Sequence, residues 1–167
     1  MDDAADRLPT MVTVFGALVD GDSVLTFRRA SEPRKGALTL PGGHKKRGES
    51  LAEACAREVL EETGLAMLEP RFLGFMEFDH PPAPRDRLCF YFRSARFSGV
   101  PTAGPEGTPG WSTLAGALAD PDCHQALAAV APFLLGSGGP FHGRALVDER
   151  GRGAYSLSRL TAGATFF

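Results

Sequence analysis

Acidic side chains gather on one short stretch of this 167-residue chain, at a spacing that suits metal chemistry. Glu58, Glu61 and Glu62 are related as i, i+3 and i+4, so on a helix they span an arc of roughly 100° on one face. Carboxylates this close repel one another and raise one another's pKa unless a cation lies among them. Because the ligand atoms are oxygens, the preferred cation is hard, Mg²⁺ first and Mn²⁺ second. The stretch therefore predicts a divalent-metal site.

These glutamates belong to a longer pattern of fixed spacing. The pattern runs Gly43, five residues, Glu49, seven residues, Arg57-Glu58-Val59, one residue, Glu61-Glu62, one residue, and Gly64-Leu65. An acidic helix face is often only a solvated surface. A chance match to all these positions, however, has a probability on the order of 10⁻⁷ at ordinary residue frequencies. The full pattern therefore favours chemistry.

A helix over 51–63 is predicted to position the carboxylates. Ser50 and Glu53 have the spacing of a capping box at its start. Gly64 follows the apolar pattern, where a left-handed residue ends many helices. One stripe of the helix is expected to face the core, and its residues are Leu51, Ala54, Cys55 and Val59.

Two features beside the carboxylates can orient ligands. Arg57 lies four residues from both Glu53 and Glu61, so on a helix it can pair with and orient a carboxylate. Gly42 and Gly43 let the backbone approach closely, where it offers a carbonyl to a metal or an amide to a phosphate.

The rest of the chain predicts an α+β fold with a mixed sheet between helices. Strands are expected at 10–19, 24–27, 38–40, 71–78 and 87–97, and loops at 79–85 and 98–110. Helical segments are expected at 111–118 and 122–135, and a hairpin at 141–147 and 154–160. The length predicts a single domain over 1–167, with a core at 9–135 and a C-terminal hairpin within 141–160.

Composition narrows the class of partner. The net charge is −2, the pI is about 6.1 and no basic stripe appears, so polymeric nucleic acid is not an expected partner. Residues 1–8 lack the hydrophobic segment of a secretory signal, and no apolar run reaches transmembrane length. A cytoplasmic enzyme with no membrane partner is therefore expected. Cys55, Cys89 and Cys123 are expected to be reduced thiols.

With this pattern the chain resembles the Nudix hydrolase family. Glu106, a few residues before Trp111, resembles the corresponding segment of MutT-type members, and Phe141-His142-Gly143-Arg144 resembles the C-terminal end of enzymes that hydrolyse oxidised purine nucleotides. The resemblance spans roughly 10–160 and is strongest at 41–65. It implies the Nudix fold, a mixed β-sheet sandwiched between helices.

The resemblance also implies roles for individual residues. The implied metal ligands are Gly42, Glu58, Glu61, Glu62 and Glu106. The implied catalytic residues are Glu58, Glu62, Glu106 and Arg57, with Gly43, Glu49 and Gly64 in support. Candidates for substrate binding are Arg28, Arg29, Thr39, Asp120 and Asp122. The two aspartates equally suit the N-cap of the helix that follows.

The expected activity is Mg²⁺-dependent hydrolysis of nucleoside triphosphates, including oxidised purine (d)NTPs such as 8-oxo-dGTP, to a monophosphate and pyrophosphate. The enzyme is expected to be a monomer or homodimer that binds a small nucleotide. One alternative is a hydrolase of dinucleoside polyphosphates or nucleotide sugars. Hydrolysis of RNA 5′ ends is disfavoured by the missing basic surface. A non-catalytic nucleotide-sensing module is disfavoured because every glutamate of the pattern is present.

Overall fold

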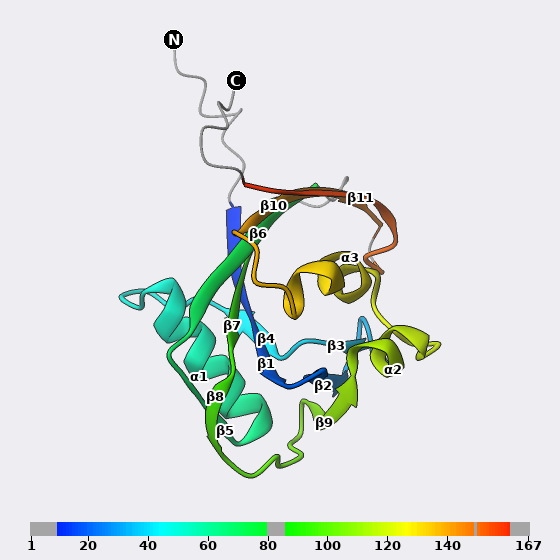
Figure 1. The fold of residues 1–167 in the computed structure, drawn as a ribbon. Coiled ribbons are helices and arrows are strands. Elements are labelled where there is room, and N and C mark those ends of the chain that lie inside the picture. Colours follow the sequence, from blue (N-terminus) through cyan, green and yellow to red (C-terminus); the bar gives the residue numbers. More distant parts are fainter. Residues whose placement is uncertain (1–9, 80–85, 149, 161–167) are drawn as a thin grey trace.

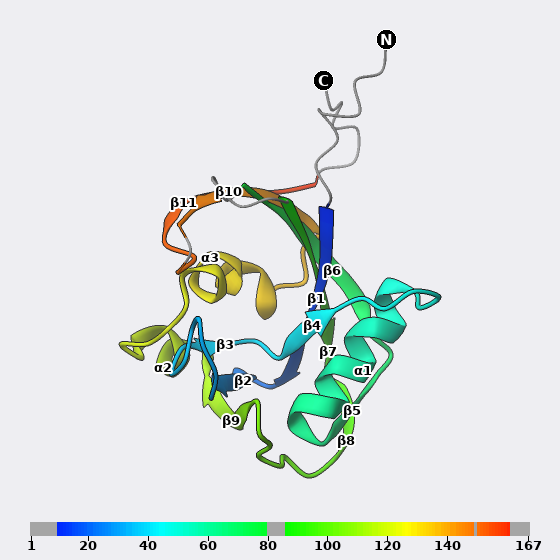
Figure 2. The same ribbon diagram turned by 180° about the vertical axis from the view of Figure 1, so that it is seen from behind.

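The structure is a computed structural model that describes residues 10–79, 86–148 and 150–160. Figures 1 and 2 show helix α1 on one face of the central strands and helix α3 on the other. The elements in chain order are β1 (Thr10–Asp20), β2 (Ser23–Arg29), β3 (Leu38–Thr39), β4 (Gly42–His44), α1 (Leu51–Thr63), β5 (Leu65–Leu68), β6 (Arg71–Asp79), β7 (Asp86–Ser94), β8 (Arg96–Gly99), β9 (Gly107–Thr113), α2 (Leu114–Ala119), α3 (Gln125–Leu134), β10 (Phe141–Val147) and β11 (Gly153–Arg159).

The main sheet of the described residues is mixed and has the order β11-β10-β6-β7-β1-β2-β3. Strand β1 runs parallel to β7, and β10 runs parallel to β6, whereas the other pairs are antiparallel. Strand β4 also pairs with β1, and β9 with β2, while β5 and β8 form a separate two-stranded sheet. The predicted mixed sheet between helices is confirmed.

The C-terminal hairpin extends this sheet. Strands β10 and β11 pair from Phe141 opposite Arg159 to Val147 opposite Gly153. Strand β10 also lies beside β6, where Phe141 pairs with Gly74. The hairpin prediction is confirmed, with its second strand starting one residue earlier than expected.

Helix α1 forms as its sequence predicts. The Ser50 hydroxyl accepts a hydrogen bond from the Glu53 amide, and the Glu53 carboxylate accepts one from the Ser50 amide, which completes the capping box. Gly64 ends the helix with a left-handed φ of 74°, a conformation that costs glycine little. Ala54, Cys55 and Val59 are fully buried, which confirms the predicted core stripe. The helix is thus fixed at both ends and along one face.

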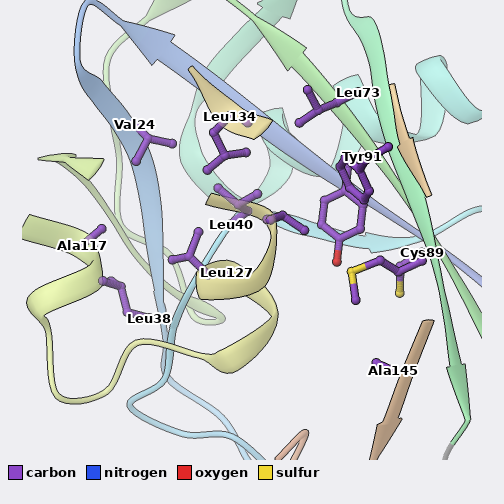
Figure 3. Packing of buried hydrophobic residues seen from close by; sticks show 14 of the residues in the cluster. Val24, Leu38, Leu40, Leu73, Cys89, Tyr91, Ala117, Leu127, Leu134 and Ala145 are labelled. Carbon is purple, nitrogen blue, oxygen red and sulfur yellow. The ribbon is translucent and has the colours of Figure 1, made fainter. Parts of the chain in front are cut away.

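Two apolar clusters hold the layers together. On the α1 side, Val14 and Leu18 of β1 pack with Cys55 and Val59. On the α3 side, Leu127 and Leu134 belong to one cluster with Tyr91 of β7 and with Leu40, which follows β3. Figure 3 shows Leu127 beside Leu40 in this cluster. The sheet is therefore anchored on both faces.

Four local predictions are wrong. The segment 111–118 is not helical from its start, because Trp111 lies in β9 and pairs with Leu25. The segment 98–110 is not all loop, since it includes the end of β8 and the start of β9. The strand expected over 87–97 ends at Ser94, and β8 follows it. Helix α3 starts at Gln125 rather than 122, with His124 as its N-cap.

Two expectations fall outside the described ranges, namely the loop at 80–85 and the character of residues 1–8. Within those ranges, no helix is both long and apolar enough to cross a membrane. Cys55 and Cys89 are buried free thiols, and Cys123 is a partly buried one.

Candidate active site

Arg57 organises the acidic face of α1. Its guanidinium donates to both carboxylate oxygens of Glu49, at 2.5 and 3.0 Å, and its Nη1 donates to Glu58 at 2.7 Å and Glu61 at 3.0 Å. Its Nη2 also donates to the His44 carbonyl at 3.0 Å. The hydrogen bonds from Arg57 and from the Lys46 amide lower the pKa of Glu49 to about 2. Arg57 therefore ties three glutamates of the pattern to the strand β4 region.

The glycines of β4 bring the backbone against two of the glutamates. Strand β4 pairs with β1 so that Gly43 lies opposite Val14 and Gly42 opposite Phe15. A methyl group added at Gly43 would overlap the Glu58 carboxylate, so that carboxylate lies directly over the Gly43 backbone. The Gly42 amide donates to the Glu62 carboxylate at 2.7 Å. Both glycines thus bring the backbone against its neighbours, and the predicted contact with a metal or a phosphate stays a prediction.

Glu62 is the buried carboxyl of the site, with 6% of its surface exposed. Burial, together with the charges of Glu106 and Glu58, raises its pKa to about 7 against the opposing hydrogen bond from the Gly42 amide. Glu106, in the turn before β9, is therefore close enough to act on Glu62 electrostatically. The structure thus places Glu58, Glu62 and Glu106 around one region.

The acidic residues of this region suit the predicted cation in chemical type. Four carboxylates that repel one another beside a backbone turn are the oxygen donors that Mg²⁺ or Mn²⁺ prefers. Among the described residues, however, no three His, Cys, Asp or Glu side chains already converge closely enough to enclose an ion. Arg57 instead holds Glu58 and Glu61 as ion pairs. The donors fit a hard cation in kind, and the metal site stays a prediction.

A cavity of about 320 Å³ opens beside Glu62, between the sheet and α3. Alternate residues of β1 and β7 form its floor, because Met11, Thr13 and Phe15 pair with Arg87, Cys89 and Tyr91. The other lining residues include Phe27, Arg29, Arg34, Thr39, Gly42, Gly43, Glu62, Phe78, His124, Leu127 and Val130. The size and the mostly apolar, partly cationic lining are typical of a small-molecule site.

The predicted substrate-binding residues divide into two groups. Arg29 and Thr39 line the cavity. Arg28 lies outside its lining, and its guanidinium forms ion pairs with Asp120 at 2.5 Å and Asp122 at 3.4 Å. The expectation that these aspartates cap the following helix is wrong, because Asp120 ends α2 and His124 caps α3. These three residues therefore brace the α2–α3 turn against β2.

Arg34, Arg87 and His124 line the cavity but were not expected there from the sequence. One signal could have located Arg87: the apolar residues Leu88 and Phe90 face one side of β7, so Arg87 must face the other. Arg34 lies in a connection between strands and His124 at the start of a helix, where no repeating sequence pattern predicts which way a side chain points. Their positions depend on the tertiary fold.

His124 predicts a measurable loss of stability in acid. Its Nδ1 accepts from the Ala126 amide at 3.1 Å, and burial together with the charge of Arg34 lowers its pKa to about 4. The fold thus favours the neutral ring, so stability is complete above pH 6.5 and falls as the pH drops from 6.5 towards 4. Urea unfolding across this range should show wild type losing up to about 3 kcal/mol relative to His124→Asn.

Asparagine suits this comparison because it keeps an N-cap acceptor but does not titrate. Parallel stability curves for the two proteins between pH 7.5 and 4.5 would show that His124 is not neutral in the fold.

Comparison with known proteins agrees with this geometry. The NUDIX domain family model matches residues 9–127. The 8-oxo-dGTP diphosphatase of Escherichia coli (strain K12) is 32% identical over 97 residues, which cover 58% of this chain and 73% of that protein. The ADP-ribose pyrophosphatase of Methanocaldococcus jannaschii is 40% identical over 63 residues, 38% of this chain and 37% of that protein. The match thus spans little more than a third of the archaeal relative.

Solved structures extend the likeness to the whole fold. A MutT protein from Bacillus halodurans superposes with a TM-score of 0.77 at 25% identity, covering 88% of this chain and 97% of its own. The NUDIX domain of Shewanella oneidensis NrtR, solved with ADP ribose, has a TM-score of 0.63 at 20% identity. The superposition covers 77% of this chain and 88% of that chain, and it shows a shared fold. Because the family model covers well over half of the chain, this protein belongs to the NUDIX domain family, and its fold is that of MutT-type members.

Proposed function

We propose that this protein hydrolyses nucleoside triphosphates, including oxidised purine nucleotides, to a nucleoside monophosphate and pyrophosphate, with Mg²⁺ as the cofactor. The observation that carries the proposal is the placement of the Arg57-ordered glutamates and Glu62 at one side of a nucleoside-sized cavity. The E. coli 8-oxo-dGTP diphosphatase and the MutT-type fold support this substrate class.

In this proposal the carboxylates of Glu58, Glu61, Glu62 and Glu106, with the Gly42 carbonyl, would hold the cation. When bound, the cation supplies charge neutralisation for the phosphates and lowers the pKa of a coordinated water. Glu62, buried beside the Gly42 amide, is the candidate to accept a proton from the attacking water. Arg57 positions Glu49, Glu58 and Glu61 rather than touching the substrate.

The cavity would take the nucleoside. Phe15 stacks on Tyr91 with ring centroids 5.3 Å apart, and both line the cavity with Phe27 and Phe78. These rings offer apolar contact to a base, and Arg29 supplies a cationic group on the Glu62 side of the cavity. The nucleoside and phosphate regions of the substrate are thus matched by different parts of one site.

A panel of nucleotides tests the proposal. Purified protein with Mg²⁺ is incubated with 8-oxo-dGTP, dGTP, UTP, a dinucleoside polyphosphate and ADP-ribose, and the products are separated by chromatography. The expected result is a monophosphate and pyrophosphate from the triphosphates. Inert triphosphates together with rapid cleavage of ADP-ribose would instead favour the second candidate, an ADP-ribose hydrolase, which the archaeal relative supports.

A further inference from the structure

Three arginines from different segments meet at the cavity. Arg29 ends β2, Arg34 lies in the connection before β3, and Arg87 is near the start of β7. Glu62 is the one carboxyl among the described lining residues, and the Gly42 amide already binds it. The cavity therefore gathers more positive than negative charge.

The described part of the chain does not compensate these guanidinium groups. The Nε atoms of Arg29 and Arg34 are buried and have no hydrogen-bond partner among the described residues. The Arg34 guanidinium contacts the ring of His124, 3.3 Å from Nη1 to Nε2, and this ring carries no negative charge. Within the described ranges, no carboxylate forms an ion pair with Arg29, Arg34 or Arg87.

The neighbouring Arg28 shows what a structural arginine looks like in this fold. It lies beside Arg29 on the same strand and is neutralised by Asp120 and Asp122. By contrast, burial lowers the pKa of Arg34, and the charges of Arg87 and Arg29 lower it further, so the three cations repel one another. Such an arrangement costs stability unless an anion completes it.

The register of the strands separates Arg87 from the glutamates. Phe15 lies opposite Gly42 and Tyr91, whereas Met11 lies opposite Arg87. Four residues of strand correspond to about 13 Å along β1. Arg87 is therefore at the end of the cavity remote from the phosphate-cleaving region, and Arg29 is at the end nearer to Glu62.

We propose that Arg34 and Arg87, with Arg29 behind them, bind a phosphate group that the substrate carries on its nucleoside, separate from the phosphates that are cleaved. A neutral base could accept hydrogen bonds from these groups but would leave their charge uncompensated. Arginine binds phosphate through paired, charge-assisted hydrogen bonds, which suits the unpaired Nε groups. This inference rests on the proposed function and narrows its substrate class to nucleotides that bear an additional phosphate.

Matched pairs of substrates test the inference. We compare GTP with its 3′-phosphorylated form, and ADP-ribose with its 2′-phosphorylated form. Wild type should favour the phosphorylated member of at least one pair by about 10- to 100-fold in kcat/KM, the scale expected for hydrogen bonds to a charged group. Arg34→Met and Arg87→Met should lose this preference, so that the two members of each pair are hydrolysed with similar kcat/KM. Equal rates within both pairs for wild type would overturn the inference.

A binding measurement separates failure of the inference from failure of the proposed function. Inorganic phosphate should raise the melting temperature of wild type and of the control Arg96→Met, an exposed arginine on β8 that pairs with Glu69. Phosphate should not raise the melting temperature of Arg34→Met or Arg87→Met. Their melting without phosphate shows whether the two variants fold. An equal rise in all four proteins would overturn the inference, even if no nucleotide is hydrolysed. A rise confined to wild type and Arg96→Met, without substrate preference, would show a free-anion site and overturn the substrate assignment.

Discussion

Glu58→Gln should lower kcat for nucleotide hydrolysis by at least about 10²-fold and leave the fold intact. The substitution keeps the shape of the side chain but removes the charge that Arg57 binds at 2.7 Å and that lies over Gly43. A neutral amide is a poorer ligand for a hard cation and no longer anchors the Arg57 guanidinium. Steady-state kinetics with saturating Mg²⁺ measure the loss, and circular dichroism with thermal unfolding verifies the fold.

Glu53→Gln is the matched control for this substitution. It makes the same chemical change on the same helix, but Glu53 accepts from the Ser50 amide in the capping box and does not contact Arg57. Its expected effect is a small loss of stability and unchanged kcat. Turnover by Glu58→Gln equal to that of Glu53→Gln would refute the assigned role of Glu58.

The acidic helix was predictable because its signals are local. The capping box, the left-handed glycine and the buried stripe depend on neighbours within a few residues, and each is present in the structure. Arg57 was expected to orient a carboxylate four residues away, and Glu61 is such a partner. Glu49 and Glu58 also bind Arg57, because β4 brings the loop before α1 to the guanidinium. Glu53 instead takes part in the capping box.

Other parts were not predictable because their structure depends on distant partners. Trp111 was expected to open a helix, yet it extends beside Leu25 because β2 offers a free edge to β9. The segment 65–68 was assigned no structure and forms β5, because β8 lies beside it. Whether a short segment without a strong alternating pattern forms a strand depends on the strand edge with which it can pair.

The residues on the substrate side of the site were likewise only partly predictable from the sequence. Arg28 and Arg29 are adjacent in sequence, and both were candidates for phosphate binding. Successive side chains of a strand point to opposite faces, so only Arg29 reaches the cavity, while Arg28 pairs with Asp120. Which of the two faces the cavity could not be known until the strand was placed between α1 and α3.

Gly43→Ala should reduce hydrolysis about as strongly as Glu58→Gln while costing little stability. Gly43 has no left-handed φ, so alanine fits its backbone, but the new methyl group would overlap the Glu58 carboxylate. That carboxylate ends a flexible side chain, so it can rotate away with only a small loss of stability. The displaced group would no longer lie between Arg57 and the backbone, and the expected loss in kcat is about 10²-fold.

Two other glycines make this expectation specific. Gly104→Ala adds a methyl group that meets no atom within 4 Å, so both activity and melting temperature should stay unchanged. At Gly42 the added methyl would overlap the Val14 carbonyl, which is backbone of a central strand and cannot move away. Gly42→Ala should therefore mainly lose stability, whereas Gly43→Ala should mainly lose activity. A Gly43→Ala protein with wild-type kcat would show that the Glu58 carboxylate does not need its position over β4 for chemistry.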